Sequence, residues 1–412
     1  MSSIKIHHPT KKLFGSVHLP GSKSESNRAL ILQALSGNSF QIENLSTARD
    51  TQNLKNILAT NQQTVDVIDA GTSMRFLTAY YAATNQHKII TGSARMKKRP
   101  MAPLVNALNE MGFDIRYVEE EGFAPIEIFP IKSFEKLESE VHIQGNISSQ
   151  FITALLLIAP FLPNGLTIHF YTALTSKPYV EMTLSMLEHF GVKYIWSENS
   201  IAVSKTEIQN PKFEVGSDWS AASYWYSMAF LADEAEIFLE GLQNKWSQGD
   251  RIMADWMKRF GIATEFKEGG ALIKNIHTAY PKVMKLDFAD NPDLAQTFAV
   301  MFAAKDIAAT FTGIDSLRLK ETDRIQALQN ELRKCGYKFD YSDEFFFYQL
   351  RGKLHLPTAP VNTYDDHRMA MSLAALGLLG EIEIENPDVV IKSYPEFWGE
   401  MQKNGFVILV DD

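Results

Sequence analysis

The chain repeats one kind of segment six times, and this periodicity is the strongest constraint on its fold. Each copy opens with small polar residues and runs directly into an apolar stretch of helical length. The copies read GSKSESNRALILQAL, GTSMRFLTAYYA, GNISSQFITALLLIA, GSDWSAASYWYSMAFLA, NPDLAQTFAVMFAA and YDDHRMAMSLAALGLL. From the second copy onward, successive copies begin about 70 to 75 residues apart.

A second recurring segment is an amphipathic helical stretch that ends in glycine and continues with alternating apolar and polar residues. A glycine just beyond a helix is typical of a left-handed C-cap, and alternation is typical of a strand. The first copy, LKNILATNQQTVDVI, lacks the glycine. In the other five copies the glycines are Gly112, Gly191, Gly261, Gly336 and Gly405.

Two helices and several strands therefore recur about every 70 residues, and we predict six α/β units, three in each of two domains. The 412 residues are too many for a single hydrophobic core. Stretches such as FITALLLIA and FAVMFAA are apolar nearly all round, so we expect these helices inside each domain and the strands outside. The alternative is an ordinary α/β sandwich with coincidental spacing.

Composition excludes several classes of protein. The 49 acidic and 40 basic residues give a net charge of -9, opposite in sign to a generic nucleic-acid or anionic-membrane binder. The single cysteine, Cys335, excludes a disulfide framework and a cysteine-based metal site. The longest apolar stretch, residues 151–163, is too short to span a membrane, and residues 1–12 do not resemble a secretory signal. We expect a cytoplasmic protein with no nucleic-acid or membrane partner.

Basic residues gather at the starts of the apolar helices and in three other short segments. A helix start offers unpaired N–H groups and a positive dipole end, and small residues let an anion approach them. We expect so many cations to be held together by bound anions, which indicates a site for anionic small molecules. The residues are Lys23, Arg28, Arg75, Arg95, Lys97, Arg99, Lys320, Arg324, Arg368 and Lys392.

Each of these residues also has a purely structural interpretation. Serines at helix starts are common N-caps, and so is an acid such as Asp293. Glu321 and Arg324 have the spacing of a surface ion pair. His367 is typical of a hydrogen-bonded structural histidine. No phosphate loop, GxGxxG, HExxH or GxSxG motif is present. The serines and the possible capping residues are Ser22, Ser24, Ser148, Ser149, Asp365 and Asp366.

Nine motifs occur in a fixed order over residues 20–397: PGSKSESNRAL, DAGTSMRFL, ARMKKRPMAPLVNAL, ISSQFITALL, SKPYVEMTL, QGD, LKETDRI, DDHRMAM and IKSYPEF. Together they resemble the 5-enolpyruvylshikimate-3-phosphate synthase family. The resemblance implies two inside-out α/β barrel domains, each of three βαβαββ repeats with buried helices and outer sheets. It places residues 21–215 in the first domain and residues 1–20 plus 216–412 in the second, with the active site in the cleft between them.

The resemblance also implies the reaction. The carboxyvinyl group of phosphoenolpyruvate moves to the 5-hydroxyl of shikimate 3-phosphate, and inorganic phosphate leaves. Addition and elimination pass through a tetrahedral adduct, without a metal, a cofactor or a covalent enzyme intermediate. Each phosphate carries roughly -1.5 to -2 at neutral pH and each substrate adds a carboxylate, so about five negative charges require a similar number of cations. A monomer is expected.

Site residues follow from the matched motifs. Asp293 is implied as the base for the 5-hydroxyl, with Lys320, Glu321 and Lys23 as further catalytic candidates whose individual steps stay open. Gly71 is implied to govern access of the herbicide glyphosate. The residues implied for shikimate 3-phosphate are Lys23, Ser24, Arg28, Ser148, Ser149, Gln150, Ser176, Tyr179, Asp293, Ser316 and Lys320. Those implied for phosphoenolpyruvate are Lys23, Gly71, Arg99, Gln150, Arg324, Arg368 and Lys392.

The chain departs from the family pattern at four positions and leaves two alternatives open. Ser316 stands where the family has an asparagine that contacts substrate. The related UDP-N-acetylglucosamine enolpyruvyl transferases use a loop cysteine, whereas Cys335 follows a predicted helix and is expected to be buried. A non-catalytic anion-binding protein on the same scaffold is the other alternative. The remaining departures are Asp69, Lys98 and Trp219.

Overall fold

The computed structural model describes residues 2–244, 248–344 and 347–411, and these form two compact units. The amino-terminal unit comprises Lys23–Ser46 and Asp50–Val215. The carboxy-terminal unit comprises the residues up to Ser22, Thr47–Arg49 and the residues from Gly216 onward. Each unit has its own hydrophobic core. That residues 21–215 and residues 1–20 plus 216–412 are separate folding domains stays a prediction.

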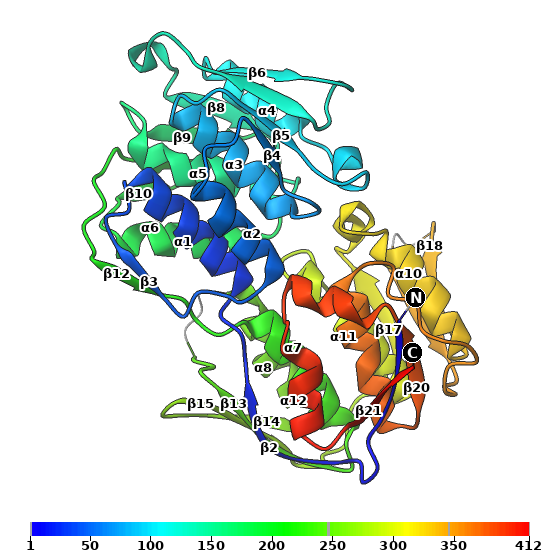
Figure 1. The fold of residues 1–412 in the computed structure, drawn as a ribbon. Coiled ribbons are helices and arrows are strands. Elements are labelled where there is room, and N and C mark those ends of the chain that lie inside the picture. Colours follow the sequence, from blue (N-terminus) through cyan, green and yellow to red (C-terminus); the bar gives the residue numbers. More distant parts are fainter. Residues whose placement is uncertain (1, 245–247, 345–346, 412) are drawn as a thin grey trace. The chain divides into compact units, whose positions relative to one another are not determined.

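The amino-terminal unit alternates helices with short strands (Figure 1). Its helices are α1 (Lys23–Leu35), α2 (Arg49–Leu58), α3 (Gly71–Ala83), α4 (Ala102–Glu110), α5 (Ser149–Ile158) and α6 (Lys177–His189). Its strands are β3 (Gln41–Glu43), β4 (Thr64–Asp66), β5 (Lys88–Thr91), β6 (Asp114–Tyr117), β7 (Ile126–Phe129), β8 (Glu140–Ile143), β9 (Leu166–Phe170), β10 (Tyr194–Trp196), β11 (Ser200–Val203) and β12 (Lys212–Glu214).

The carboxy-terminal unit has the same alternation and also includes the first two strands of the chain. Its helices are α7 (Trp219–Leu231), α8 (Ile252–Lys258), α9 (Ala295–Ala304), α10 (Arg324–Lys334), α11 (His367–Ala374) and α12 (Phe397–Lys403). Its strands are β1 (Ser3–His7), β2 (Lys12–His18), β13 (Glu234–Glu240), β14 (Ile262–Lys267), β15 (Gly270–Asn275), β16 (Val283–Asp287), β17 (Ala308–Thr312), β18 (Tyr337–Ser342), β19 (Phe347–Gly352), β20 (Ile382–Glu385) and β21 (Val407–Asp411).

Four sheets share one topology, which is the structural form of the repeat. Their strand orders are β4-β5-β7-β6, β8-β9-β11-β10, β2-β13-β15-β14 and β16-β17-β19-β18. In each sheet the first two strands are parallel and the later pairs are antiparallel. The other two sheets are smaller, with orders β12-β3 and β20-β1-β21. The copy without a glycine, LKNILATNQQTVDVI, contributes only α2 and β4 and has no hairpin directly after its helix.

The inner helices of each unit are buried, as predicted. In the amino-terminal unit α1, α3 and α5 pack against one another, and in the other unit α9 packs against both α7 and α11. Every residue of α7 and of α9 is buried. The five predicted C-cap glycines all have left-handed backbone, with φ between 76° and 105°. Cys335 is buried at the end of α10, and burial raises the pKa of its thiol to about 12.

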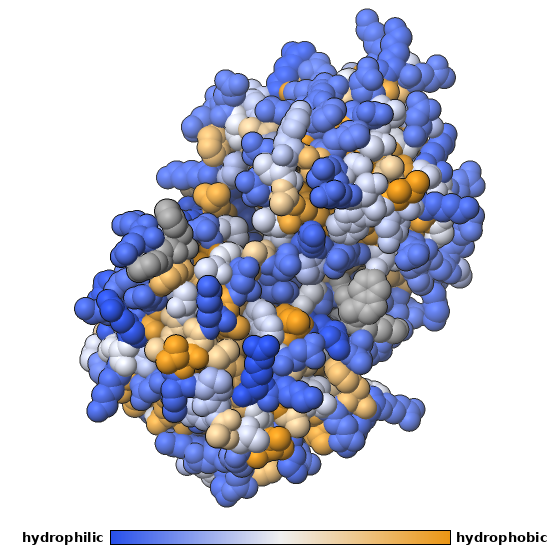
Figure 2. Space-filling view, turned by 180° about the vertical axis from the view of Figure 1, so that it is seen from behind, coloured by the Kyte–Doolittle hydropathy of each residue, from blue (hydrophilic) through white to orange (hydrophobic). Residues whose placement is uncertain are grey.

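The predicted fold class is confirmed: the chain is a two-domain α/β protein with buried helices and outer sheets. In the described residues, none of the helices combines the length and apolarity that a membrane crossing requires. On the face shown in Figure 2, hydrophilic residues predominate and apolar side chains are scattered among them. Such scattered exposure is ordinary for a folded domain.

Candidate functional site

In the amino-terminal unit, the starts of α3 and α5 lie together, and α1 packs beside both helices. Gln150, in the first turn of α5, donates from Nε2 to Oγ1 of Thr72 in the first turn of α3, at 3.1 Å. Arg28 of α1 donates to Oγ1 of Thr153 in α5, at 3.3 Å. Ser148 is the N-cap of α5, and its hydroxyl accepts from the backbone N–H of Gln150. The first turns of α3 and α5 are therefore neighbours, and helix starts are where anions commonly bind.

Arg28 is a buried cation whose hydrogen bonds all go to uncharged oxygens. Its guanidinium donates to the hydroxyls of Thr183 and Thr153 and to the carbonyls of Ser24 and Tyr179, at 2.7 to 3.3 Å. Burial lowers the pKa of Arg28 to about 10. Four of its five N–H groups are used in these bonds, so one donor and the full positive charge are available to an anion.

Gly71 and Arg99 are in direct contact at the start of α3. A Cβ on Gly71 would lie 2.4 to 2.6 Å from the guanidinium atoms of Arg99. Arg75 joins the two segments, because it donates to the carbonyl of Gly71 at 3.1 Å and to that of Pro100 at 2.7 Å. The structure therefore brings these two predicted residues together. Arg75, which the sequence marked only as a cation, acts as a tie between α3 and the segment that carries Arg99.

Two further predicted residues lie at helix starts in this unit. Lys23 begins α1, and its Nζ forms an ion pair with Asp50 at 3.2 Å, with both side chains largely buried. Ser176 precedes α6 with a left-handed backbone, φ 54° and ψ 37°. A non-glycine residue in that region is strained, and such strain is concentrated at functional sites. Sequence reasoning gave no role to Asp50, because nothing local relates it to Lys23.

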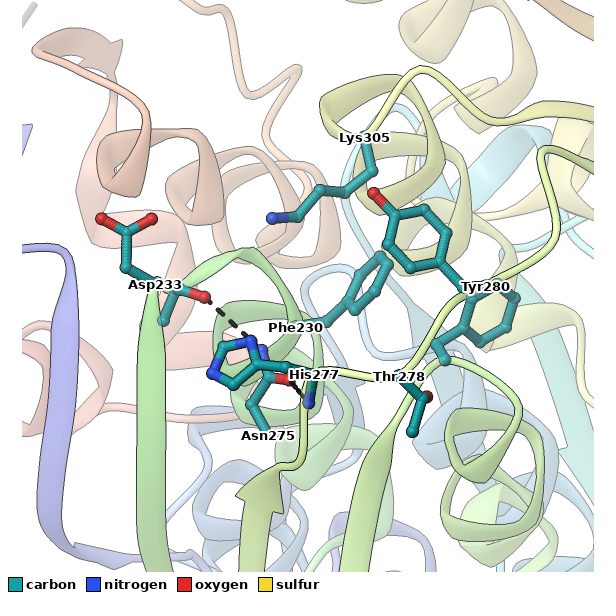
Figure 3. A pocket seen from close by; sticks show the side chains of 9 residues that line it. Phe230, Asp233, Asn275, His277, Thr278, Tyr280 and Lys305 are labelled. Atoms are coloured by element: carbon teal, nitrogen blue, oxygen red, sulfur yellow. Dashed lines mark hydrogen bonds between the residues drawn. The ribbon is translucent and has the colours of Figure 1, made fainter.

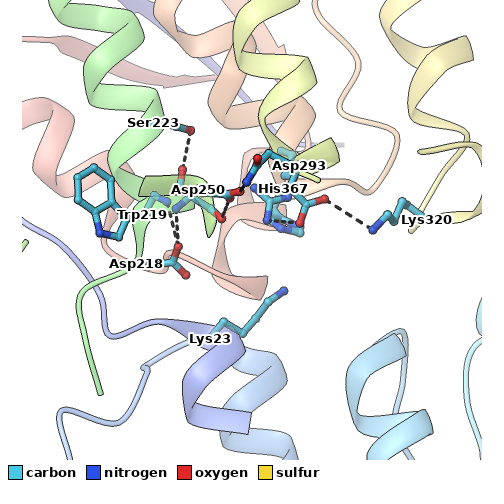
Figure 4. A network of polar contacts seen from close by, with 12 residues as sticks. Lys23, Asp218, Trp219, Ser223, Asp250, Asp293, Lys320 and His367 are labelled. Carbon is cyan, nitrogen blue, oxygen red and sulfur yellow. Dashed lines mark hydrogen bonds and ion pairs between the residues drawn. The ribbon is translucent and has the colours of Figure 1, made fainter. Parts of the chain in front are cut away.

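In the carboxy-terminal unit, seven side chains form one charged cluster around Asp293. Asp293 lies just before α9 and contacts Arg368 at 2.9 Å, Arg324 at 3.0 Å and Lys320 at 3.7 Å. Figure 4 shows Asp293 facing Lys320. The members of this charged cluster are Lys320, Arg324, Arg368, Lys392, Asp293, Glu321 and Asp366.

Arg324 is the hub of the charged cluster and is only 2% exposed. It contacts three carboxylates, Asp366 at 2.6 Å, Glu321 at 2.8 Å and Asp293 at 3.0 Å. We expected bound anions to hold the cations together, and carboxylates of the chain do part of this for Arg324. Two structural alternatives also hold in part, since Glu321 does pair with Arg324, and Asp366 does cap α11.

The charged cluster nevertheless keeps an excess of positive charge, with four cations against three carboxylates. Burial acts to raise the pKa of Asp293, but Arg368, Lys320 and Arg324 together outweigh it and hold the pKa well below its usual range. Lys392 is 1% exposed and lies 3.6 Å from Glu321. Ser316 is exposed on a 3-10 turn, Asp315–Leu319, outside the charged cluster.

A second polar network holds the start of α7 and contains the QGD motif. Gln248 donates to Asp218, the N-cap of α7, at 3.0 Å and accepts from the backbone N–H of Trp219 at 2.8 Å. Ser220 donates to Asp250 at 2.5 Å, and Asn291 donates to the same carboxylate at 3.3 Å. Figure 4 shows this network beside Asp293. Burial, and next the charge of Asp293, raise the pKa of Asp250 to about 6.

Replacing Asp250 by asparagine is expected to remove a pH-dependent loss of stability. The ordinary pKa is 3.8 and the folded value is about 6, so between these pH values the folded protein holds a proton that the unfolded chain releases. The free energy of unfolding therefore falls by about 3 kcal/mol as pH rises through this window. The stability of D250N relative to wild type is expected to rise from pH 4 to pH 7, measured by urea unfolding.

The matched control for Asp250 is Asp255→Asn, which changes an exposed carboxylate on α8 in the same unit. Its stability relative to wild type is expected to stay constant over the same range of pH. If D250N and D255N follow wild type in parallel, Asp250 is not the titrating group.

Comparison with known proteins identifies the family of the chain. The model of the family described as EPSP synthase (3-phosphoshikimate 1-carboxyvinyltransferase) matches residues 7–65 and 55–401. A 3-phosphoshikimate 1-carboxyvinyltransferase of Bacteroides fragilis strain YCH46 is 43% identical over 400 residues, covering 96% of this chain and 97% of that protein. One of Haemophilus influenzae strain PittGG is 33% identical over 430 residues, with coverage of 96% and 97%.

Solved structures show the same fold. The EPSP synthase of Acinetobacter baumannii at 2.37 Å superposes with a TM-score of 0.75 and 20% identity, and the match covers 100% of both chains. The enolpyruvyl transferase NikO of Streptomyces tendae gives a TM-score of 0.75 and 15% identity, covering 100% of this chain and 99% of that one. With a family model that matches nearly the whole sequence, the chain belongs to the EPSP synthase (3-phosphoshikimate 1-carboxyvinyltransferase) family.

Proposed function

We propose that the chain transfers the carboxyvinyl group of phosphoenolpyruvate to the 5-hydroxyl of shikimate 3-phosphate and releases inorganic phosphate, as an enzyme of aromatic amino acid biosynthesis. The observation that carries this function is the full-length relationship to 3-phosphoshikimate 1-carboxyvinyltransferases. Cys335 is buried, so it does not serve the cysteine-dependent acceptor chemistry of the UDP-N-acetylglucosamine enzymes. Asp293, Glu321 and Lys392 are all present, which argues against a non-catalytic protein.

Shikimate 3-phosphate is assigned mainly to the amino-terminal unit. The donor left on Arg28 and the N–H groups at the starts of α1 and α5 suit a phosphate monoester. Tyr179 is assigned to the ring of this substrate. Gln150, which Thr72 orients, is assigned to both substrates. The further residues in this assignment are Lys23, Ser24, Ser148, Ser149 and Ser176, with Ser316 as the weakest because it lies outside the charged cluster.

Phosphoenolpyruvate is assigned to Arg99 beside Gly71 and to the cations Arg324, Arg368 and Lys392. In the first step the 5-hydroxyl oxygen bonds to C2 of phosphoenolpyruvate, its proton passes to Asp293, and C3 gains a proton. In the second step C3 loses a proton, the bond from C2 to the phosphate oxygen breaks, and the double bond forms again. Lys320 and Glu321 are assigned to the proton transfers at C3.

Substrate charge makes Asp293 a better base. In the protein alone, the neighbouring cations hold the pKa of Asp293 below its usual range, and a carboxylate with such a pKa accepts protons poorly. Anions bound to Arg324 and Arg368 offset that positive field, so the pKa of Asp293 rises when phosphoenolpyruvate binds. Asp293 then acts as an efficient base only when phosphoenolpyruvate is bound.

Replacing Gly71 by alanine is expected to raise the KM for phosphoenolpyruvate by about tenfold. The added methyl group pushes the Arg99 guanidinium away, so its charge-assisted hydrogen bond to phosphoenolpyruvate is lost. The new Cβ would lie within 2.6 Å of the guanidinium, and the end of a flexible side chain moves before backbone does. Unfolding free energy is therefore expected to stay within about 1 kcal/mol of wild type. Steady-state kinetics and urea unfolding measure the two quantities.

The control for Gly71 is Gly399→Ala, in α12, where an added Cβ meets no described atom within 4 Å. It is expected to leave the KM unchanged. An unchanged KM in G71A as well would show that Arg99 does not hold phosphoenolpyruvate in the position assigned here.

A phosphate-release assay tests the function. With phosphoenolpyruvate and shikimate 3-phosphate together, phosphate is expected to be released in a 1:1 ratio to product, and UDP-N-acetylglucosamine is expected to give none. Release with the nucleotide sugar but not with shikimate 3-phosphate would overturn the assignment. We also propose a cytoplasmic monomer without nucleic-acid or membrane partners, which sedimentation equilibrium and cell fractionation would check.

A further inference from the structure

A cavity of about 280 Å³ lies in the carboxy-terminal unit and shares no lining residue with the charged cluster. It is bounded by the last turn of α7, the segment that follows β15, and Lys305 just after α9. Figure 3 shows Lys305 extending its ammonium group into this space above Phe230. The proposed transfer reaction gives this cavity no role.

Lys305 is a partly buried cation that uses only some of its N–H donors. Its Nζ donates to the carbonyl of Leu231 at 3.3 Å and lies 5.5 Å from the centroid of the Phe230 ring. Within residues 2–244, 248–344 and 347–411, no carboxylate forms an ion pair with it. The contact with Leu231 caps the end of α7, but it uses one of three N–H donors. Burial also lowers the pKa of Lys305.

Aromatic rings form the wall beside this cation. Phe230 meets Tyr280 edge to face, with centroids 5.0 Å apart, and meets Phe260 at 5.5 Å. Lys282 lies 4.4 Å from the centroid of the Tyr280 ring and adds a second positive charge. Asp233 is exposed on the lining, and although it forms no ion pair with Lys305 in the described residues, its carboxylate acts on that cation electrostatically. The surroundings therefore combine aromatic rings with the cation Lys305, and they also include the carboxylate of Asp233.

We propose that this cavity binds a small molecule with a carboxylate on a flat ring. The carboxylate lies on the ammonium group of Lys305 and fills the donors that Leu231 leaves unused. The ring packs against Phe230 and Tyr280, which offer faces and edges for aromatic contact. The volume of about 280 Å³ is just below the range for small-molecule sites, roughly 300 to 1,000 Å³, so the ligand is a single-ring compound.

Comparing benzoate with benzamide and acetate tests separately whether the negative charge and the ring contribute to binding. Binding to the full-length protein is measured by saturation-transfer NMR titration, in excess inorganic phosphate so that the cations assigned to phosphorylated substrates are occupied. Benzoate is expected to bind, and benzamide and acetate are each expected to bind at least about tenfold more weakly, because one lacks the charge and the other the ring. Equal binding of benzoate and either analogue would overturn the proposal, as would no binding of benzoate.

Two lysine variants test whether benzoate binds in this cavity. Lys305→Met keeps the length and apolar stem of the side chain, and it is expected to weaken benzoate binding by at least about tenfold. Lys282→Met removes the neighbouring exposed charge and is expected to change it by less than about threefold. Both variants are expected to keep the phosphate-release activity, which shows that they are folded. Unchanged benzoate binding in K305M would overturn the assignment to this cavity.

Discussion

Asp293→Asn is expected to lower kcat by at least about a hundredfold, the usual loss when a general base is removed. Binding of both substrates is expected to persist. Asp293 neutralises part of the charge on Arg324, Arg368 and Lys320 in the protein alone. Removing its carboxylate leaves those cations more available to anions, so the KM for phosphoenolpyruvate is expected to stay the same or fall. Phosphate release at saturating substrate measures kcat, and calorimetry measures the binding of shikimate 3-phosphate.

The control for Asp293 is Asp323→Asn, because Asp323 caps α10 close in sequence to the charged cluster but pairs with the exposed Arg318 instead. It is expected to keep kcat within about threefold of wild type. Turnover of D293N within about tenfold of wild type would remove Asp293 from the role of base. A large rise in KM with little change in kcat would instead identify Asp293 as a group that binds substrate.

The fold could be predicted largely because its repeat leaves local signals. The glycines after the amphipathic helices adopt left-handed backbone, and helices such as α9 are apolar on every side because they are interior. The pairing of strands could not be predicted in this way. β2 lies parallel to β13, with Lys12 opposite Glu234, and no local pattern relates segments so far apart in the sequence. The pairing depends on how the units close, which is a tertiary property.

The candidate site, like the fold, could be predicted from the sequence only in part. Motifs identified the cations, because phosphate and carboxylate ligands need Arg and Lys whatever surrounds them. Two of the counter-charges were missed, since Asp366 was interpreted only as a cap and Asp50 was not considered. Asp366 does cap α11, but its carboxylate also lies 2.6 Å from Arg324. This double role arises because the fold brings the start of α10, which carries Arg324, beside the start of α11, and no local sequence pattern predicts that proximity.

Arg324→Met is expected to destabilise the carboxy-terminal unit by about 3 to 5 kcal/mol, the range found when one partner of a buried ion pair is removed. Arg324 is 2% exposed and contacts Asp366, Glu321 and Asp293. Methionine fills much of the same volume, so the loss arises from carboxylates left in a buried site without their main counter-charge. Protonation relieves that repulsion, and the deficit is therefore expected to shrink as pH falls.

Urea unfolding followed by tryptophan fluorescence measures this loss, because Trp219, Trp225, Trp256 and Trp398 all lie in the carboxy-terminal unit. Lys274→Met is the matched control: Lys274 pairs with Glu236 at 2.9 Å on the surface of the same unit, where both side chains are exposed. Its loss is expected to stay below about 1 kcal/mol. If R324M costs no more than K274M, the three carboxylates do not depend on Arg324. The charged cluster would then be held by Lys320, Arg368 and Lys392, and its architecture would not require an arginine at the centre.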